Sequence, residues 1–209
     1  MKTEKIKIYR NGEGMQEALN LTEKFAAYME LEGRNKFHLR LLAEEMFSMV
    51  RAITEDFSAD FWLEEETGTC RLHLEAKSDL DYSKRRELLS VSTRGKNIAQ
   101  RGIMEKVREI IEAGLYSMEE SFSLQAQFGM AMFNYGSVGI IDTGMSDAVY
   151  SWSMQKYRDN VNSARSGDPA ASEAWDELEK SIIANVADDV IVGVRKDGVE
   201  LIVEKEIKS

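Results

Sequence analysis

The chain has 209 residues, with 27 Lys and Arg against 37 Asp and Glu and a formal net charge of -10 at pH 7. This length is typical of one domain, or of one domain with a large insertion. The acidic balance argues against general affinity for a nucleic-acid backbone or an anionic membrane. The single cysteine, Cys70, excludes a disulfide framework within the chain and a cysteine-based metal site.

The opening residues, "MKTEKIKIYRNGEG", lack the apolar core of a secretory signal, so we expect a cytoplasmic location. The longest run without charges is residues 121–141. It is long enough to span a bilayer, but it contains polar amides and three glycines. We therefore do not expect a membrane helix or a membrane partner.

The first quarter of the chain has patterns that predict one strand and two helices. Residues 5–10 alternate apolar and polar side chains, which predicts a strand, and the Asn-Gly-Glu-Gly run after them predicts a turn. Residues 14–30 carry apolar groups at helical spacing. Gly33 and Asn35 predict a break before a second helix, "LRLLAEEMFSMVRAI", at residues 39–53.

Two stretches predict β-hairpins. Residues 60–77 alternate on both sides of Thr67 and Gly68, and the last hairpin has β-branched arms joined by "KDG" at residues 196–198. A helix is predicted before the last hairpin. Pro169 and the acidic residues after it suit a helix N-terminus, because the dipole favours acids there. Its predicted buried stripe is Trp175, Leu178, Ile182, Ile183 and Val186.

The middle of the chain differs from both ends and predicts a helical insertion at residues 82–168. Residues 84–114 are charged and helical in pattern, whereas residues 115–157 are rich in Met and aromatic groups. Met-rich surfaces suit adaptable binding, so we expect this second part to bind a protein partner or to form a homo-oligomer. The alternative is that these side chains fill a core.

Without the insertion, the predicted order is strand, helix, helix, hairpin, helix, hairpin. It predicts an α/β two-layer sandwich, with a mixed β-sheet and the helices on one face. In this order, and in the helix at residues 39–53, the chain resembles the GHKL superfamily, the ATPase fold shared by histidine kinases, gyrase B and the anti-sigma serine kinases. The resemblance covers residues 1–81 and 169–209 and places residues 82–168 in the position of the ATP lid.

The resemblance implies a role for individual residues, with ATP and Mg²⁺ as cofactors. The second helix of the family carries a Glu-x-x-x-Asn box, and here Glu44 falls on the general-base glutamate and Ser48 on the magnesium-binding asparagine. Asp79 or Asp81 would stand for the aspartate that recognises adenine. Arg51 shares the polar face of the helix with Glu44 and is a candidate ligand contact.

The motifs also depart from the family pattern. A serine hydroxyl is a poorer magnesium ligand than an amide oxygen, and no glycine lies between Gly68 and Gly95, where backbone should approach the ligand. We therefore expect a degenerate nucleotide site and a regulatory, protein-binding function with weak or no ATP turnover. The alternatives are a divergent ATP-binding kinase or ATPase, and a structural module whose insertion mediates oligomerisation.

Three further signals carry less weight. Asp142-Thr143-Gly144 is the tripeptide of aspartic proteases, but those enzymes need two aspartates on an all-β frame, and the predicted helices around it indicate a loop. The basic stretch at residues 84–108 could bind an anion or form a solvated face. His38 and His73 lack any partner pattern, so we expect both to be incidental, with His73 on the polar side of a strand.

Overall fold

The computed structural model describes residues 1–9, 11–53, 58–77, 107, 150–195 and 198–207. Its elements, in chain order, are β1 (Ile6–Tyr9), α1 (Met15–Tyr28), α2 (Gly33–Ile53), β2 (Ser58–Glu66), β3 (Thr69–Lys77), β4 (Tyr150–Ser153), α6 (Met154–Ala164), α7 (Pro169–Lys180), α8 (Ile182–Val186), β5 (Asp189–Arg195) and β6 (Gly198–Glu206). Among the helices described, none combines the length and apolar character needed to cross a bilayer.

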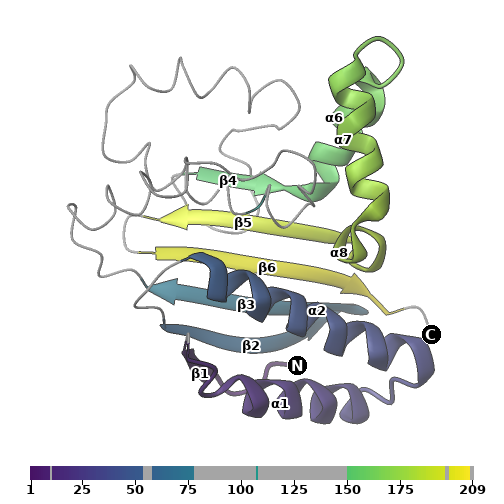
Figure 1. Ribbon diagram of the computed structural model, residues 1–209. Helices are drawn as coiled ribbons and strands as arrows, with labels where there is room; N and C mark the ends of the chain where they lie inside the picture. Colours follow the sequence, from purple (N-terminus) through teal and green to yellow (C-terminus); the bar gives the residue numbers. More distant parts are fainter. Residues whose placement is uncertain (10, 54–57, 78–106, 108–149, 196–197, 208–209) are drawn as a thin grey trace, which may run out of the picture.

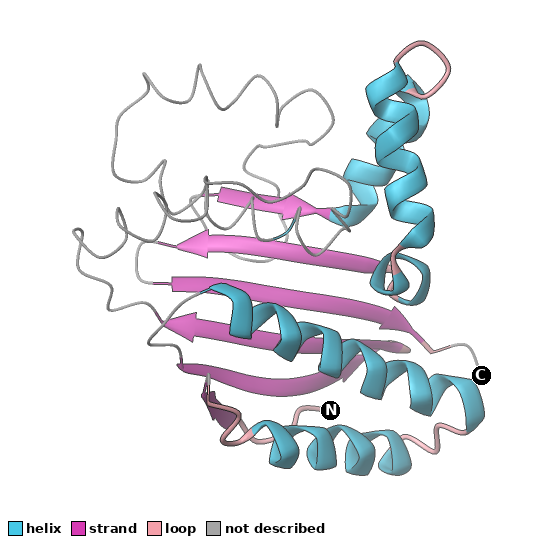
Figure 2. Ribbon diagram, in the orientation of Figure 1, coloured by secondary structure: helices cyan, strands magenta, loops and turns pink. Residues whose placement is uncertain are grey.

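The strands form one six-stranded sheet in the order β1-β2-β3-β6-β5-β4 (Figure 1). At its centre β3 pairs with β6 from Thr69 opposite Glu206 to Lys77 opposite Gly198. This pairing confirms that the two ends of the chain close into a single sheet. The α/β two-layer architecture predicted from the sequence is therefore confirmed, with helices on one layer and strands on the other (Figure 2).

Every ladder that the structure describes is antiparallel, whereas the sequence led us to expect a mixed sheet. The number of helices between strands explains the difference. When one helix connects two strands, the second strand runs parallel to the first. Two helices, α1 and α2, connect β1 to β2, and the second helix reverses the chain direction once more. β2 therefore runs antiparallel to β1, beside which it lies.

Alternating side chains give the sheet two different faces. The row that faces the helices crosses all six strands of the sheet and consists of Ile6, Phe61, Leu74, Leu201, Val192 and Trp152, all buried. On α2, the Phe47 ring packs edge-on against Phe61, with ring centroids 5.0 Å apart. Tyr157 of α6 contacts Trp152 at 5.8 Å. The helices α2 and α6 therefore cover the same face. The opposite face of the sheet, which carries Trp62, His73, Ile202 and Ile191, is called the open face below, although these four central side chains are buried.

The two halves of the sheet share an element order, strand–helix–helix–hairpin, with the short α8 added in the second half. The second strands of the two hairpins are β3, which begins at Thr69, and β6, which begins at Gly198. When these first residues are matched, His73 of β3 matches Ile202 of β6, because each lies four residues further along its strand. These two residues are also cross-strand partners in the β3–β6 ladder. The halves are thus related by an approximate two-fold axis at the sheet centre, although the sequence shows no internal repeat.

Most predicted elements are confirmed within a few residues. The strand at residues 5–10 is β1, and the helix at residues 14–30 is α1. The first hairpin turns at Thr67 and Gly68, whose φ angles of 51° and 82° match the two left-handed positions of a type I′ turn. The predicted break at Gly33 is a helix start instead, because the chain reverses just before it, at Glu30 with φ 53°.

The helix predicted after Pro169 is divided in two. Asp168 caps α7 and Pro169 occupies its first turn, as predicted, but Ser181 is extended and its hydroxyl accepts from the Ala184 N–H to start α8. This interruption changes the helical phase. Leu178 is buried as expected, whereas Ile182, placed in the same predicted stripe, is 52% exposed.

The predicted boundaries of the insertion, residues 82 and 168, stay a prediction, and one observation concerns the second boundary. Residues 150–164, which the sequence analysis assigned to the insertion, form β4 and α6, and β4 pairs with β5 in the common sheet. Residues 78–149 lie outside the described part of the chain, apart from Val107, which is completely buried in the core.

Candidate functional site

The outer surface of α2 carries the two residues aligned with the family's catalytic box. Glu44 and Ser48 are both exposed. The Glu44 Oε1 atom accepts a hydrogen bond from Arg40 Nε at 2.9 Å, and the same guanidinium binds Glu23 of α1. The structure therefore brings Glu44 and Ser48 together on one face, as predicted, but that face looks outward and Glu44 is engaged in a surface ion-pair chain.

The other predicted ligand contacts are only partly described. The backbone of Arg51 belongs to α2, whereas Asp79 and Asp81 lie outside the described residues. In the described ranges, no group of three His, Cys, Asp or Glu side chains is arranged to hold a metal ion. The proposed roles of these residues therefore stay predictions.

A second polar stripe on α2 faces the body of the protein. His38 and Glu45 are seven residues apart, so they share one face of the helix, and both are partly buried. The Nδ1 atom of His38 is buried without a hydrogen-bond partner among the described residues. Burial lowers the pKa of His38, with help from the charges of Lys205 on β6 and Arg34. Glu45, which the alignment passes over, is thus the less exposed of the two adjacent glutamates.

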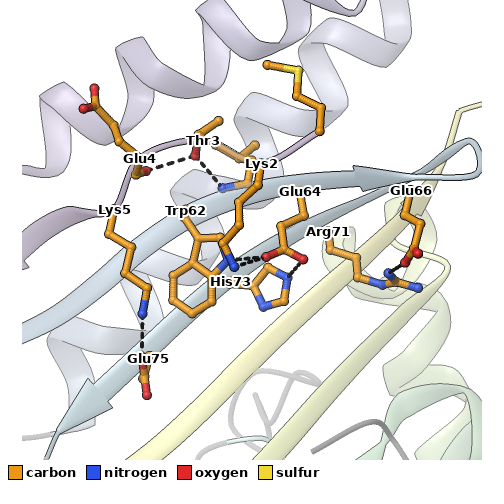
Figure 3. Close-up of polar contacts among 12 residues, drawn as sticks. Lys2, Thr3, Glu4, Lys5, Trp62, Glu64, Glu66, Arg71, His73 and Glu75 are labelled. Carbon is orange, nitrogen blue, oxygen red and sulfur yellow. Dashed lines mark hydrogen bonds and ion pairs between the residues drawn. The ribbon is translucent and has the colours of Figure 1, made fainter.

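The open face of the sheet holds a polar cluster centred on His73 and Trp62 (Figure 3). The two rings are stacked, with centroids 4.6 Å apart and planes 6° from parallel. His73 is only 7% exposed, and its Nε2 and Nδ1 atoms lie 3.6 Å from carboxylate oxygens of Glu64 and Glu200, respectively. Neither ring nitrogen has a hydrogen bond in the described part of the chain.

His73 lies on the polar side of its strand, as the sequence predicts, but it is buried at the centre of this cluster. The missed signal is the register of the hairpin. A two-residue turn at Thr67 and Gly68 fixes His73 opposite Trp62. Counting outward from the turn would have identified the pair.

Glu64 connects the cluster to the N-terminal segment. Its Oε1 atom accepts from Trp62 Nε1 at 3.0 Å and also binds the Lys2 ammonium group. Burial alone would raise the pKa of Glu64, but the hydrogen bonds from Lys2 and Trp62 and the nearby His73 together hold its pKa below the ordinary value. The carboxylate form is therefore stabilised at this site.

Further ion pairs extend across the open face. Lys5 Nζ lies 2.9 Å from Glu75 Oε2, and Arg71 donates to Glu204 of β6 at 2.7 Å and to Glu66 at 3.0 Å. The Arg71–Glu204 bond crosses the junction between the two halves of the sheet. Each of these carboxylates is therefore already paired with a lysine or an arginine.

A buried carboxylate in the second half has a structural role. Asp189 is 8% exposed, and its oxygens accept from Ser153 Oγ at 2.8 Å and from the Gln155 N–H at 2.9 Å, at the start of α6. Burial raises the pKa of Asp189 despite these hydrogen bonds. Asp189 thus fixes the N-terminus of α6 to the first residue of β5.

Comparison with known proteins does not identify the family of this chain. The chain matches no family model, no curated protein and no solved structure, so what it does must be argued from its own residues.

Proposed function

We propose that this chain is a GHKL-like regulatory module that binds a protein partner and turns over ATP weakly or not at all. The element order that suggested the family is compatible with the sheet, since its two ends pair through β3 and β6. The partner surface belongs to residues 115–157, where Met and aromatic side chains accumulate. A homo-oligomer through the same residues is the variant of this proposal in which the partner is a second copy.

One observation carries the argument against efficient turnover. A general base must reach the proton that it removes, and it works best in a site that excludes water. Glu44 instead is 43% exposed on the outer surface of α2 and accepts from Arg40. Ser48 is exposed on the same face. This position suits a solvated helix surface better than a nucleotide site.

A divergent ATP-binding protein is the second candidate, with ATP and Mg²⁺ as ligands. Glu45 favours it, because this glutamate is partly buried on the stripe that it shares with His38. In that case Glu45 and not Glu44 would be the acid on the ligand side. The two candidates therefore differ in which of two neighbouring residues affects the nucleotide.

A thermal-shift series with ATP and ADP, with and without MgCl₂, tests nucleotide binding, because a ligand specific to the folded state raises the melting temperature by mass action. The regulatory proposal expects either no shift, or a shift without phosphate release in a parallel hydrolysis assay. Sustained phosphate release by the purified chain would contradict it and favour the second candidate.

Matched variants make the hydrolysis assay decisive. Glu44→Ala and Glu23→Ala each remove one carboxylate from the same Arg40 guanidinium, so they should have equal and small effects if Glu44 is a surface residue. Loss of phosphate release in Glu44→Ala alone would restore the base assignment. Loss in Glu45→Ala alone would support the second candidate. Light scattering of the intact chain tests the homo-oligomer variant, which requires a mass above that of one chain.

A further inference from the structure

The N-terminal segment is attached to β2 through an irregular step. Ile6 pairs with Phe61 and Lys2 pairs with Glu64, so three residues of the segment stand opposite two residues of β2. Such an extra residue is a β-bulge, and bulges re-aim side chains. Thr3 stabilises the step: its N–H donates to the Leu63 carbonyl at 2.9 Å, and its Oγ1 accepts from the Leu63 N–H at 3.0 Å.

The bulge turns two lysines toward one tryptophan. Residues three apart on a regular strand point to opposite faces, but Lys2 and Lys5 both lie over the Trp62 ring. Their ammonium groups are 5.1 Å and 4.1 Å from the ring centroid. Figure 3 shows both side chains reaching across the open face, Lys5 to Glu75 and Lys2 to Glu64. Each ammonium group thus meets an aromatic face and a carboxylate.

The groups that receive these lysines are held in place by other contacts. The Trp62 ring is fixed by its stack on His73 and by the hydrogen bond from Nε1 to Glu64. The depressed pKa of Glu64 keeps this carboxylate ionised. Trp62 is 5% exposed, whereas the Lys2 and Lys5 side chains are 57% and 45% exposed. The receiving groups are therefore more firmly held than the lysines that occupy them.

We propose that Trp62, Glu64 and Glu75 form a recognition site for the ammonium groups of lysine side chains. In this structure the chain's own Lys2 and Lys5 fill the site, and a lysine-bearing extended segment of a protein partner takes their place by displacing residues 1–5 from the edge of β2, where Met1 and Thr3 now bond to Glu65 and Leu63. Strand addition of this kind supplies backbone hydrogen bonds while side-chain sites supply selectivity. This site consists of other residues than the partner surface proposed at residues 115–157, so the inference goes beyond the proposed function.

The test uses the full chain with the double substitution Lys2→Ala and Lys5→Ala, which empties the site. The probe is n-butylammonium, the head of a lysine side chain, with neutral n-butanol as the control. The readout is the Trp62 indole N–H resonance in a ¹H–¹⁵N NMR spectrum, identified by its loss in Trp62→Phe. We expect a saturable shift with n-butylammonium only. Adding Glu75→Gln should weaken the binding about tenfold, equivalent to about 1.4 kcal/mol.

Three outcomes would overturn the proposal: no saturable shift, an equal shift with n-butanol, or unchanged binding after Glu75→Gln. An equal response in the unsubstituted chain would show that Lys2 and Lys5 do not fill the site. Circular dichroism verifies folding. Exposed ion pairs contribute little to stability, so the double variant should fold, and Lys5→Ala alone provides a second test.

A peptide tests the partner part separately. The synthetic segment MKTEK, residues 1–5, is added to an emptied chain that also carries Thr3→Pro, which removes both bonds of Thr3 to Leu63. It should bind about tenfold more tightly than the same peptide with neutral norleucine at the positions of Lys2 and Lys5. Equal affinities, or no binding, would overturn replacement by a partner segment. These results are independent of the nucleotide experiments, because α2 packs on the opposite face of the sheet, where Phe47 meets Phe61.

Discussion

The two halves of the sheet share a topology but differ on the open face. In the first half, Trp62 stacks on His73, and Glu64 binds both the indole N–H and Lys2. The matching positions of the second half hold two isoleucines and a glycine, namely Ile191, Ile202 and Gly193. The second half shows that this fold requires only apolar or small side chains there. The polar cluster of the first half is therefore additional to what the topology needs.

The largest expected effect comes from truncating the aromatic member of the matched pair. Trp62→Ala removes a nearly buried ring and its contacts with Lys2, Lys5 and His73, so it should lower the free energy of unfolding by about 3 kcal/mol. Ile191→Ala, at the matching position, should cost about 2 kcal/mol. Urea denaturation followed by far-UV circular dichroism measures both. A larger cost for Ile191→Ala would mean that the cluster does not distinguish the halves energetically.

A smaller and opposite effect is expected when the first half is made to resemble the second. His73→Ile replaces a ring whose two buried nitrogens have no hydrogen bond in the described part of the chain. An unpaired buried polar group costs about 1–3 kcal/mol of stability, so its removal is favourable. Loss of the stack between His73 and Trp62 is unfavourable and offsets part of this gain. We therefore expect stabilisation by about 1 kcal/mol in urea denaturation at pH 7.

The reciprocal substitution is the control. Ile202→His buries a second ring at the other position on the approximate two-fold axis, so it should destabilise the fold by about 2 kcal/mol. If His73→Ile destabilises instead, polar contacts of the imidazole in the folded protein must outweigh the hydrogen bonds to water that it loses on folding.

Local chemistry determined which features the sequence could predict. Thr67 and Gly68 predict a hairpin, because a type I′ turn needs two residues in the left-handed conformation. This two-residue turn determines which residues of β2 and β3 pair. The break at Ser181 was not predictable in the same way, since serine is tolerated inside helices and its capping role depends on tertiary structure.

The candidate site was less predictable than the fold. Helical spacing correctly grouped Glu44 with Ser48, but it could not tell whether their face meets a ligand or water. Strand alternation placed His73 on the polar side and gave no information about its depth. Its burial depends on neighbours from β2 and β6 that are distant in sequence, such as Glu200.

Two bridging arginines allow a finer comparison between the open face and the helical layer. Arg71 binds Glu66 and Glu204 across the β3–β6 junction, and Arg40 binds Glu23 and Glu44 between α1 and α2. The Arg71 side chain is 31% exposed and that of Glu204 26%, so their pair is less solvated than those of Arg40.

Arg71→Met should therefore cost about 1 kcal/mol and Arg40→Met measurably less, with both costs reduced in high salt. Chemical denaturation with urea at low and high NaCl measures them. Equal costs, or a cost that does not respond to salt, would indicate that packing of the arginine stems outweighs the charges.

The smallest expected effect is a difference in pH dependence between Glu64 and Asp189. The folded-state pKa of Glu64 lies below the ordinary pKa of a glutamate, so its contribution to stability is present above that ordinary pKa and is lost as the pH falls through the folded-state pKa. The folded-state pKa of Asp189 lies above the ordinary pKa of an aspartate. Its contribution is fully present below that ordinary pKa and is lost as the pH rises through the folded-state pKa.

Urea titrations of the wild type, Glu64→Gln and Asp189→Asn across the acidic range separate these two contributions. On acidification, the stability of the wild type relative to Glu64→Gln should fall, whereas its stability relative to Asp189→Asn should rise. The opposite signs follow from the surroundings of the two carboxylates. Lysine, indole and imidazole stabilise the charge of Glu64, while burial outweighs the hydrogen bonds that Asp189 accepts at the start of α6. Slopes of the same sign would mean that the hydrogen bonds to Asp189 prevail over its burial, and the two halves would then handle buried charge alike.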